Sequence, residues 1–309
     1  MRFLAALMLW LVTTVALAAS VPAVWAQTNI VDEDGYAALA TSAAKDQRLQ
    51  DAMAGELTTQ VVSLGADNGY SLNPELVRQV ALAYTRNSGF PGQFAQANRI
   101  AHRWMFTGAV PSGNSTDQWL IDVAPMLFDP SFTATLGTLD LEVPPTLTVP
   151  ITVDSPELQP GKLRWLATWG PWAAVGAAIV TAVCALLTLA AARSRGKALT
   201  ALGVSALLVG AAGWAGIEVG GRFLESALNR TTGDIRTVAE VMVTHAEDSL
   251  HLWLNITLAA GGGLVVLGVV GSMLGGLWRR PRADPSPATS THFRWRRSGV
   301  GGRAGPNRI

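Results

Sequence analysis

The amino-acid sequence predicts a mainly α-helical, polytopic membrane protein with four transmembrane helices and an exported, mostly helical α+β domain. Three observations predict this class. The chain of 309 residues contains four long, uncharged and largely apolar runs. Its basic residues are concentrated at the chain start, in one short loop and in the C-terminal tail, whereas most acidic residues lie elsewhere. Only residues 27–164 are both long and polar enough to form a sizeable water-facing domain.

Two of the apolar runs form a predicted hairpin. Trp172–Ala192 and Ala198–Ile217 contain 21 and 20 residues without a charge. A helix of about 20 apolar residues crosses a hydrocarbon core of roughly 30 Å. The connecting segment Arg193–Lys197 carries three positive charges and no negative one, and basic loops stay on the cytoplasmic side. The predicted membrane domain is therefore residues 165–278, with helices at 166–192, 198–219 and 252–278 and an outer loop at 220–251.

The chain start is apolar enough to span a membrane as well. After Arg2, the 23 residues Phe3–Trp25 carry no charge. Val24-Trp25-Ala26 before Gln27 also fits a signal-peptide cleavage site after Ala26. However, the apolar part of a signal peptide is usually about 7–15 residues, which is shorter than this run. The length favours a retained transmembrane anchor at residues 1–26 over a removed signal peptide, and either interpretation exports the segment that begins at Gln27.

Residues 27–164 are predicted to form an extracytoplasmic domain that opens with helices. The predicted helices run from a cap at Asp46 to about Leu64, from the start signal Asn73-Pro74-Glu75 onward, and over Gln93–Thr107. The only cysteine, Cys184, lies in an apolar run outside this domain. No disulfide can therefore brace the domain, and its own core must hold it together.

The second half of this domain alternates between apolar and polar residues. Residues 118–123 and 146–153 each have the two-residue period of a strand, and a short helix is predicted over Pro125–Leu136. Pro150 cannot donate a hydrogen bond to a neighbouring strand, which suggests an edge position. The section is either a small sheet packed on the helices or a stiff stalk. Its regular alternation favours the sheet.

The predicted outer boundary of the membrane is marked by Trp165, Trp169 and Trp172, because aromatic rings of this kind favour the headgroup level. In the outer loop, Asp234–Leu250 has the period of a moderately amphipathic helix. This helix could lie on the lipid surface or pack on the domain at 27–164. Its acidic residues make contact with anionic headgroups unfavourable.

The last predicted span, 252–278, is rich in glycine, with Gly268, Gly271 and Gly275 near its end. Such residues allow close helix packing, either within the chain or between two copies, so the oligomeric state stays open. Residues 279–309 hold eight arginines, one acid and four prolines, which predicts a disordered basic cytoplasmic tail. The tail suits the anionic inner leaflet of the lipid bilayer. No nucleic-acid partner is predicted, because the positive-inside rule already accounts for the charge.

A search for reactive motifs yields no catalytic residue, no metal site and no cofactor-binding pattern. His245 and His251 are six residues apart, so a helix directs them to different faces. Asn98 and His102 are four residues apart and share one helix face, which makes them the candidate ligand-binding residues. The alternative is that they form a structural, hydrogen-bonded pair that holds their helix to its neighbours.

The chain resembles a family of uncharacterised actinobacterial integral membrane proteins. The resemblance is carried by the acidic segment Val31-Asp32-Glu33-Asp34-Gly35-Tyr36, a helix with Asp-x-x-x-Gln-Asp character, and the element Ala97–His102 with its Ala-Asn-Arg-x-Ala-His pattern. It covers most of Phe3–Trp278 but neither the tail nor the Pro91-Gly92 turn. It implies a retained first helix, an outward-facing domain and three further spans. It implies no activity.

These observations predict a multi-pass plasma-membrane protein with both termini cytoplasmic. Its expected function is that of a non-catalytic cell-envelope protein whose outer domain binds an envelope protein or another envelope component. One alternative is an envelope enzyme with an unrecognised site around Asn98 and His102. The other is an accessory subunit of a transporter, which is disfavoured because the last three spans lack ionisable residues at mid-membrane.

Overall fold

The computed structural model describes residues 2–67, 69–107, 118–122, 148–152, 161–192, 194–228 and 233–278. The helices are α1 (Arg2–Ala26), the π-helix η1 (Gln27–Val31), α2 (Glu33–Ala43), α3 (Gln47–Asp67), α4 (Pro74–Thr85), α5 (Phe90–Thr107), α8 (Arg164–Ala191), α9 (Arg195–Leu228) and α10 (Gly233–Trp278). The strands are β1 (Gln118–Asp122) and β2 (Thr148–Thr152). The prediction of a mainly helical chain is therefore confirmed.

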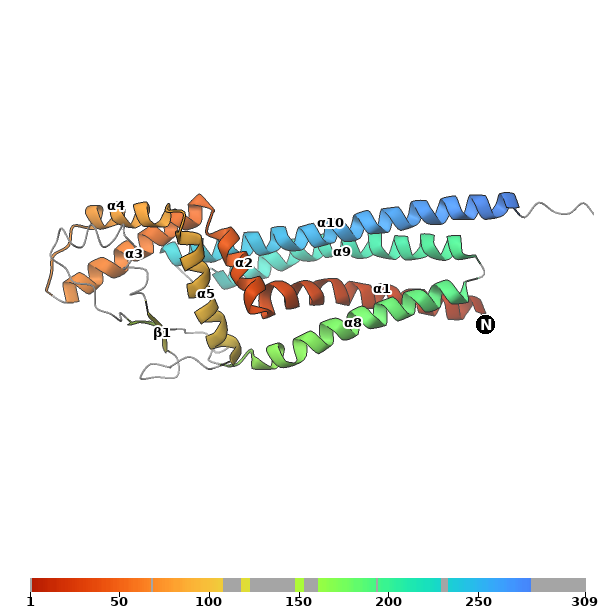
Figure 1. The fold of residues 1–309 in the computed structure, drawn as a ribbon, viewed down its shortest axis with the longest axis horizontal. Coiled ribbons are helices and arrows are strands. Elements are labelled where there is room, and N and C mark those ends of the chain that lie inside the picture. Colours follow the sequence, from red (N-terminus) through yellow and green to blue (C-terminus); the bar gives the residue numbers. More distant parts are fainter. Residues whose placement is uncertain are drawn as a thin grey trace, which may run out of the picture.

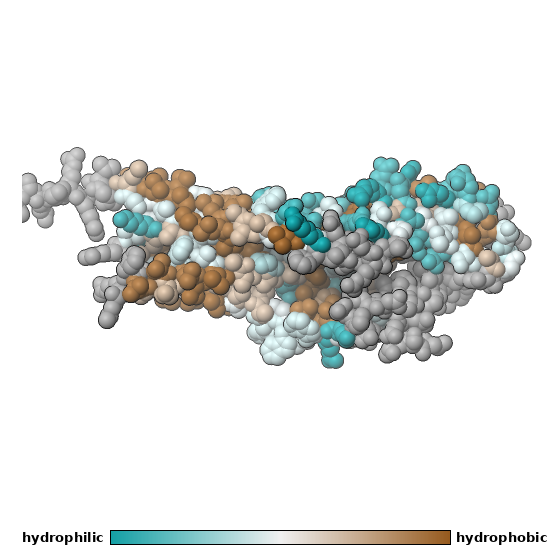
Figure 2. Space-filling model, turned by 180° about the vertical axis from the view of Figure 1, so that it is seen from behind, coloured by the Kyte–Doolittle hydropathy of each residue, from teal (hydrophilic) through white to brown (hydrophobic). Residues whose placement is uncertain are grey.

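The molecule is elongated, with an apolar bundle and a polar head. The helices α1 with η1, α8, α9 and α10 are each long and apolar enough to cross a membrane, which confirms the prediction of four membrane-length apolar helices. Apolar residues cover the bundle and polar residues gather on the head on the face seen in Figure 2. Helices α2–α5 form the head together with the first turns of α10 (Figure 1).

The four passes place three chain segments at the same end of the bundle. These are the start of α1, the connection between α8 and α9, and the end of α10, and the head lies at the opposite end (Figure 1). Within the bundle, α9 packs along α10 and α1 packs along α8, while α1 also contacts α9. The two helices of the predicted hairpin, α8 and α9, thus pack mainly on α1 and α10 rather than on each other.

Close contact between α9 and α10 depends on glycine. A Cβ atom at Gly203 would lie 2.6 Å from the carbonyl oxygen of Gly261, and one at Gly268 would lie 2.5 Å from the backbone nitrogen of Thr200. Glycine lets the two backbones approach to a distance that any side chain would prevent. Gly268 therefore packs within the chain, whereas a Cβ at Gly271 would meet nothing within 4 Å.

Hydrogen bonds from α1 tie the bundle together inside the apolar layer. The indole nitrogen of Trp10 donates to the carbonyl oxygen of Ala201 at 2.9 Å. The hydroxyl oxygens of Thr14 and Ser205 lie 2.8 Å apart, and Ser205 is fully buried. Polar side chains of this kind join helices where no water competes for them. Helix α1 is thus a structural member of the bundle.

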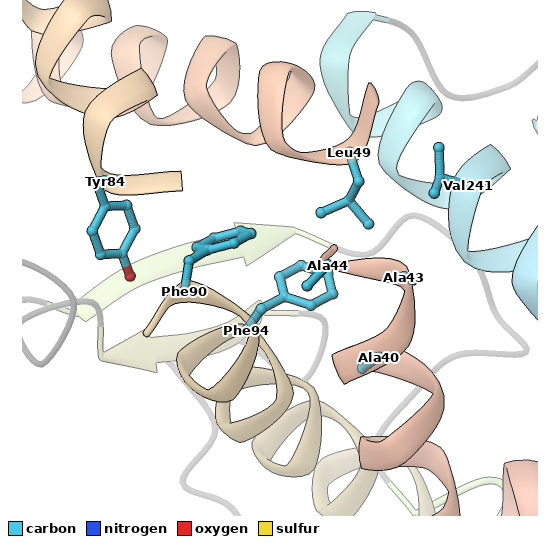
Figure 3. Packing of buried hydrophobic residues seen from close by; sticks show 8 residues of the cluster. All are labelled: Ala40, Ala43, Ala44, Leu49, Tyr84, Phe90, Phe94 and Val241. Atoms are coloured by element: carbon cyan, nitrogen blue, oxygen red, sulfur yellow. The ribbon is translucent and has the colours of Figure 1, made fainter. Parts of the chain in front are cut away.

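The head core includes a residue from α10, far away in the sequence. Val241 is 1% exposed and belongs to one buried cluster with seven residues from α2–α5 and the α2–α3 turn: Ala40, Ala43, Ala44, Leu49, Tyr84, Phe90 and Phe94. Figure 3 shows Leu49 and Val241 pointing toward one another across α3 and α10. Of the two predicted positions for the amphipathic segment at 234–250, the structure therefore shows packing on the head.

The expected outer loop at 220–251 is mostly helical. Helix α9 continues to Leu228, and α10 runs unbroken from Gly233 to Trp278, a length of 46 residues. The helix expected within this segment, at 234–250, is thus part of α10 and continues without a break into the apolar run expected at 252–278. Burial of Val241 gives the amphipathic segment a partner, so the helix does not have to end at the membrane surface.

The predicted start signals in the head act as helix caps. The Asp46 carboxylate accepts a hydrogen bond from the backbone nitrogen of Arg48 at 2.7 Å, and the Asn73 side chain accepts one from that of Glu75 at 3.0 Å. Helix α5 begins at Phe90, earlier than the predicted Gln93. The proline at the second position of α5 fits there because the first helical amides need no intrahelical partner.

The strands β1 and β2 pair antiparallel, with Leu120 opposite Pro150. A ribbon of two five-residue strands beside four head helices does not make a sheet layer. The structure therefore does not support the α+β class expected for the exported domain. The helix predicted over Pro125–Leu136 and the tail at 279–309 lie outside the described residues.

Candidate functional site

The chain leaves the membrane bundle through a tight turn. After η1, the Asp32 carboxylate accepts a hydrogen bond from the backbone nitrogen of Gly35 at 2.9 Å and caps α2. A Cβ atom at Gly35 would lie 1.7 Å from the carbonyl oxygen of Thr28. Only glycine fits there, which gives a physical reason for the glycine in the acidic segment of the sequence.

His102 connects the head to this turn. Its side chain is 4% exposed, and Nε2 lies 3.0 Å from the carbonyl oxygen of Ile30 in η1. The ring stacks on Phe106 with centroids 4.3 Å apart and lies 5.5 Å from the Tyr36 ring. As the carbonyl can only accept, Nε2 carries the proton and donates it. His102 thus holds α5 against the junction of α1 and α2.

Asn98 bonds to a different partner. Its Nδ2 donates to the carbonyl oxygen of Phe94, one turn back in α5, at 2.9 Å. The two candidate residues share a helix face, but they do not bond to a common partner: Asn98 bonds to Phe94 and His102 bonds to Ile30. Ligand binding by Asn98 and His102 therefore stays a prediction, while the contacts of His102 fit the structural alternative.

An ion-pair cluster lies beside His102 on α2 and α5. Arg99 Nη1 is 2.5 Å from Asp34 Oδ1 and 3.6 Å from Glu33 Oε1, and Arg103 Nε is 3.5 Å from the same Glu33 oxygen. The hydrogen bond to the Asp34 carboxylate is the largest of the effects that raise the pKa of Arg99. Water reaches these side chains, and ion pairs exposed to water contribute little to the free energy of folding. The main effect of the cluster is therefore to set the orientation of α2 relative to α5.

We expect His102→Ala to destabilise the head by about 2–4 kcal/mol, because it removes the donor to Ile30 and the ring stacked on Phe106. Asn98→Ala is the matched control one turn away. It removes a hydrogen bond within α5 only, and its effect should stay within about 0.5 kcal/mol. Thermal unfolding of both purified variants checks this. Equal destabilisation by the two substitutions would contradict the structural assignment of His102.

The stability of the head should also fall at high pH because of Tyr36. Burial raises the pKa of Tyr36 above its ordinary value of 10.0. The unfolded phenol loses its proton first, so the stability due to the neutral phenol is fully present below pH 10 and is lost as the pH rises through the folded pKa. Tyr36→Phe should remove this alkaline fall while leaving stability at neutral pH nearly unchanged. Melting temperatures of both proteins from pH 8 to about 11 test it.

A second candidate is a polar hollow of about 300 Å³ on the head, where α3, α4 and the start of α10 meet. It is lined by Arg48, Asp51, Ala52, Arg78, Asp234 and Thr237. Asp51 is paired with Arg86 at 3.0 Å, and Arg48 lies 3.8 Å from Glu240. No local spacing in the sequence indicates this polar hollow, because its walls come from segments far apart in the chain.

The remaining histidines and acids of the described residues do not form a metal-binding group. His245 Nδ1 lies 3.0 Å from the carbonyl oxygen of Val241 in its own helix. His251 stacks on Trp214 with centroids 3.9 Å apart, and the Trp214 indole donates to Asn255 at 3.3 Å. These contacts join α9 to α10 where the bundle meets the head.

Four helices of the described residues are long and apolar enough to cross a membrane, and this arrangement is compatible with a multi-pass α-helical protein in a lipid bilayer. Comparison with family models, curated proteins and solved structures finds no match for this chain. The resemblance based on Val31–Tyr36 and Ala97–His102 is therefore untested by these comparisons and stays an expectation.

Proposed function

We propose that this is a multi-pass protein of the cell envelope whose helical head faces away from the cytosol and binds or scaffolds another envelope component. The observation that carries the proposal is the shared helix α10. It contributes Val241 to the head core and then continues through the apolar bundle to Trp278. A head that shares a helix with the bundle in this way is held at a fixed distance from the bilayer. Such a head is suited to present a binding surface there.

The distribution of charge supports this orientation. The start of α1, the start of α9 and the end of α10 all lie at the end of the bundle away from the head. In the sequence, Arg2 opens α1, Arg193, Arg195 and Lys197 surround the start of α9, and eight arginines follow Trp278. Such segments stay cytoplasmic, because translocating clustered positive charge is unfavourable. The proposal therefore has both termini on the cytosolic side of a plasma membrane and the head on the outer side.

A retained α1 is part of the proposal. The possible cleavage site after Ala26 lies within a helix that continues directly into η1. The preceding residue, Trp25, donates from its indole nitrogen to Ser249 of α10 at 3.2 Å. In the folded protein this segment is helical and attached to the bundle, so α1 has a structural role that cleavage would abolish. An intact mass of 32.5 kDa for the purified protein would support retention, and loss of residues 1–26 would refute it.

A matched pair of cysteine variants tests the orientation. Ser88→Cys, in the turn before α5, and Ser194→Cys, between α8 and α9, are nearly isosteric changes at opposite ends of the molecule. Both are made in a Cys184→Ala background, which removes the only native thiol. An impermeant thiol reagent should label Ser88→Cys on whole cells and Ser194→Cys only after lysis. The reverse pattern would refute the proposed orientation.

Crosslinking in intact membranes tests the binding role. A photoreactive group at Ser88, on the head, should capture a specific envelope component, which mass spectrometry identifies. The same group at Ser194, on the opposite end, is the control and should not capture it. Identical products from both positions, or lipid alone from the head position, would count against a binding or scaffolding head.

A further inference from the structure

We propose that the polar hollow between α3, α4 and α10 binds a small zwitterion, namely an amino acid or short peptide that carries both an ammonium and a carboxylate group. The proposal rests on the proposed function, since it names the ligand class of an outward-facing head. It starts from two charges that face the same space. Among the residues that the structure describes, neither the Arg78 guanidinium nor the Asp234 carboxylate has an ion-pair partner, and both line the hollow.

The other charges of the hollow are already engaged. Asp51 is paired with Arg86, and Arg48 faces Glu240. This leaves one positive and one negative group on different helices, Arg78 on α4 and Asp234 on α10. A guanidinium pairs well with a carboxylate, and a carboxylate pairs well with an ammonium group. A ligand with a single charge would be attracted to one of these two groups and repelled by the other.

The walls of the hollow are held in place by the packing beneath them. Leu49 in α3 and Ala81 in α4 are fully buried, and Val241 in α10 is 1% exposed. The Asp234 carboxylate rests directly on α3, because a Cβ atom at Gly55 would lie 2.1 Å from its Oδ2. The packing fixes the backbones that carry Arg78 and Asp234, so the two charges are held on opposite walls, although the Arg78 side chain itself is exposed.

The size and lining of the hollow limit the ligand. The hollow is a shallow, open depression of about 300 Å³, which offers a small molecule charged groups on two sides but does not enclose it. The Thr237 hydroxyl adds a neutral donor and acceptor on the α10 wall. Within the hollow, two guanidinium groups balance two carboxylates, so a molecule without net charge is favoured over an anion or a cation.

The test uses the full-length protein in lipid nanodiscs. The probes are a mixture of the free amino acids and, separately, a mixture of dipeptides. We expect one mixture to raise the melting temperature, and the mixture that does so distinguishes the free amino acid from the peptide. N-acetylation or amidation of the binding compound removes one charge and should each weaken binding by at least about tenfold. This result needs no protein variant.

Two substitutions locate the site. Arg78→Gln and Asp234→Asn should each weaken binding at least about tenfold. Lys45→Gln and Glu56→Gln are matched controls, because they make the same charge changes at exposed or partly exposed head positions outside the hollow. Stabilisation that persists in the Arg78 and Asp234 variants, or that survives N-acetylation and amidation, would overturn the proposal. So would the absence of any stabilisation.

The two proposals can fail separately. If the head captures a specific envelope protein while no amino acid or dipeptide stabilises the chain, the zwitterion site is refuted and the scaffolding role stands. If whole-cell labelling places Ser88 in the cytosol, the proposed function fails whatever the hollow binds.

Discussion

Val241→Asp is expected to unfold the head while leaving the membrane bundle intact. Val241 is 1% exposed and packs against Leu49 in the shared core. A carboxylate at that position has no partner in the core, so the substitution should cost at least about 4 kcal/mol, a large part of the stability of a domain of this size. Trypsin treatment of membranes should then cleave at Arg48 and Arg99, which lie on helices of the folded head in the native protein.

Two comparisons make this result specific. Val241→Ala removes only two methyl groups and should cost about 2 kcal/mol, so its head stays folded but melts earlier. Ile235→Asp lies on the same helix at a position that is 43% exposed and should have little effect. Resistance of Val241→Asp to trypsin would show that the head folds without α10, which contradicts the shared core.

Gly203→Leu is expected to separate α9 from α10. A Cβ atom there would lie 2.6 Å from the carbonyl oxygen of Gly261 and 2.7 Å from the backbone nitrogen of Val265. Both contacts are with the backbone, which cannot rotate away, so the helices must move apart. We expect a loss of several kcal/mol, comparable with the larger core substitutions, because the contacts along the pair are lost together. The measurement is the melting temperature of the detergent-solubilised protein.

Gly262→Leu provides the control for the same change on the facing helix. A Cβ atom at Gly262 would meet nothing within 4 Å, so the leucine side chain extends into lipid. Its melting temperature should remain close to that of the native protein. An equal fall for both variants would mean that the close approach of α9 and α10 does not limit stability. An effect of Gly262→Leu alone would instead indicate that this face contacts a second copy.

The sequence predicted the helices that are specified by residues close together in the chain. Four long uncharged runs predicted the four membrane-length helices, because a helix needs about 20 consecutive apolar residues to cross the hydrocarbon core. Asp46 and Asn73 marked the starts of α3 and α4, since a cap acts on amides two or three residues away. The first half of the head was therefore predictable in outline, although α5 begins three residues earlier than expected, at Phe90 rather than Gln93.

Features that depend on distant partners were not predictable. The period of residues 234–250 indicated a helix, but nothing local showed that Val241 would join Leu49 in the head core. The sequence therefore predicted this helix, but not that it would continue without a break into the last apolar run. In the same way, the spacing of Asn98 and His102 suggested a shared site. It also allowed a structural role, but nothing local showed that His102 would contact the carbonyl group of Ile30, which only the folded junction brings within 3.0 Å.

The shared helix also sets an order of events during synthesis. Helices α2–α5 leave the ribosome long before Val241 does, and three membrane segments are made before the last piece of the head core exists. Domains commonly fold as soon as their sequence is complete. The core of the head therefore stays incomplete until α10 is made, so its maturation depends on the last apolar helix and on whatever protects the unfinished helices meanwhile.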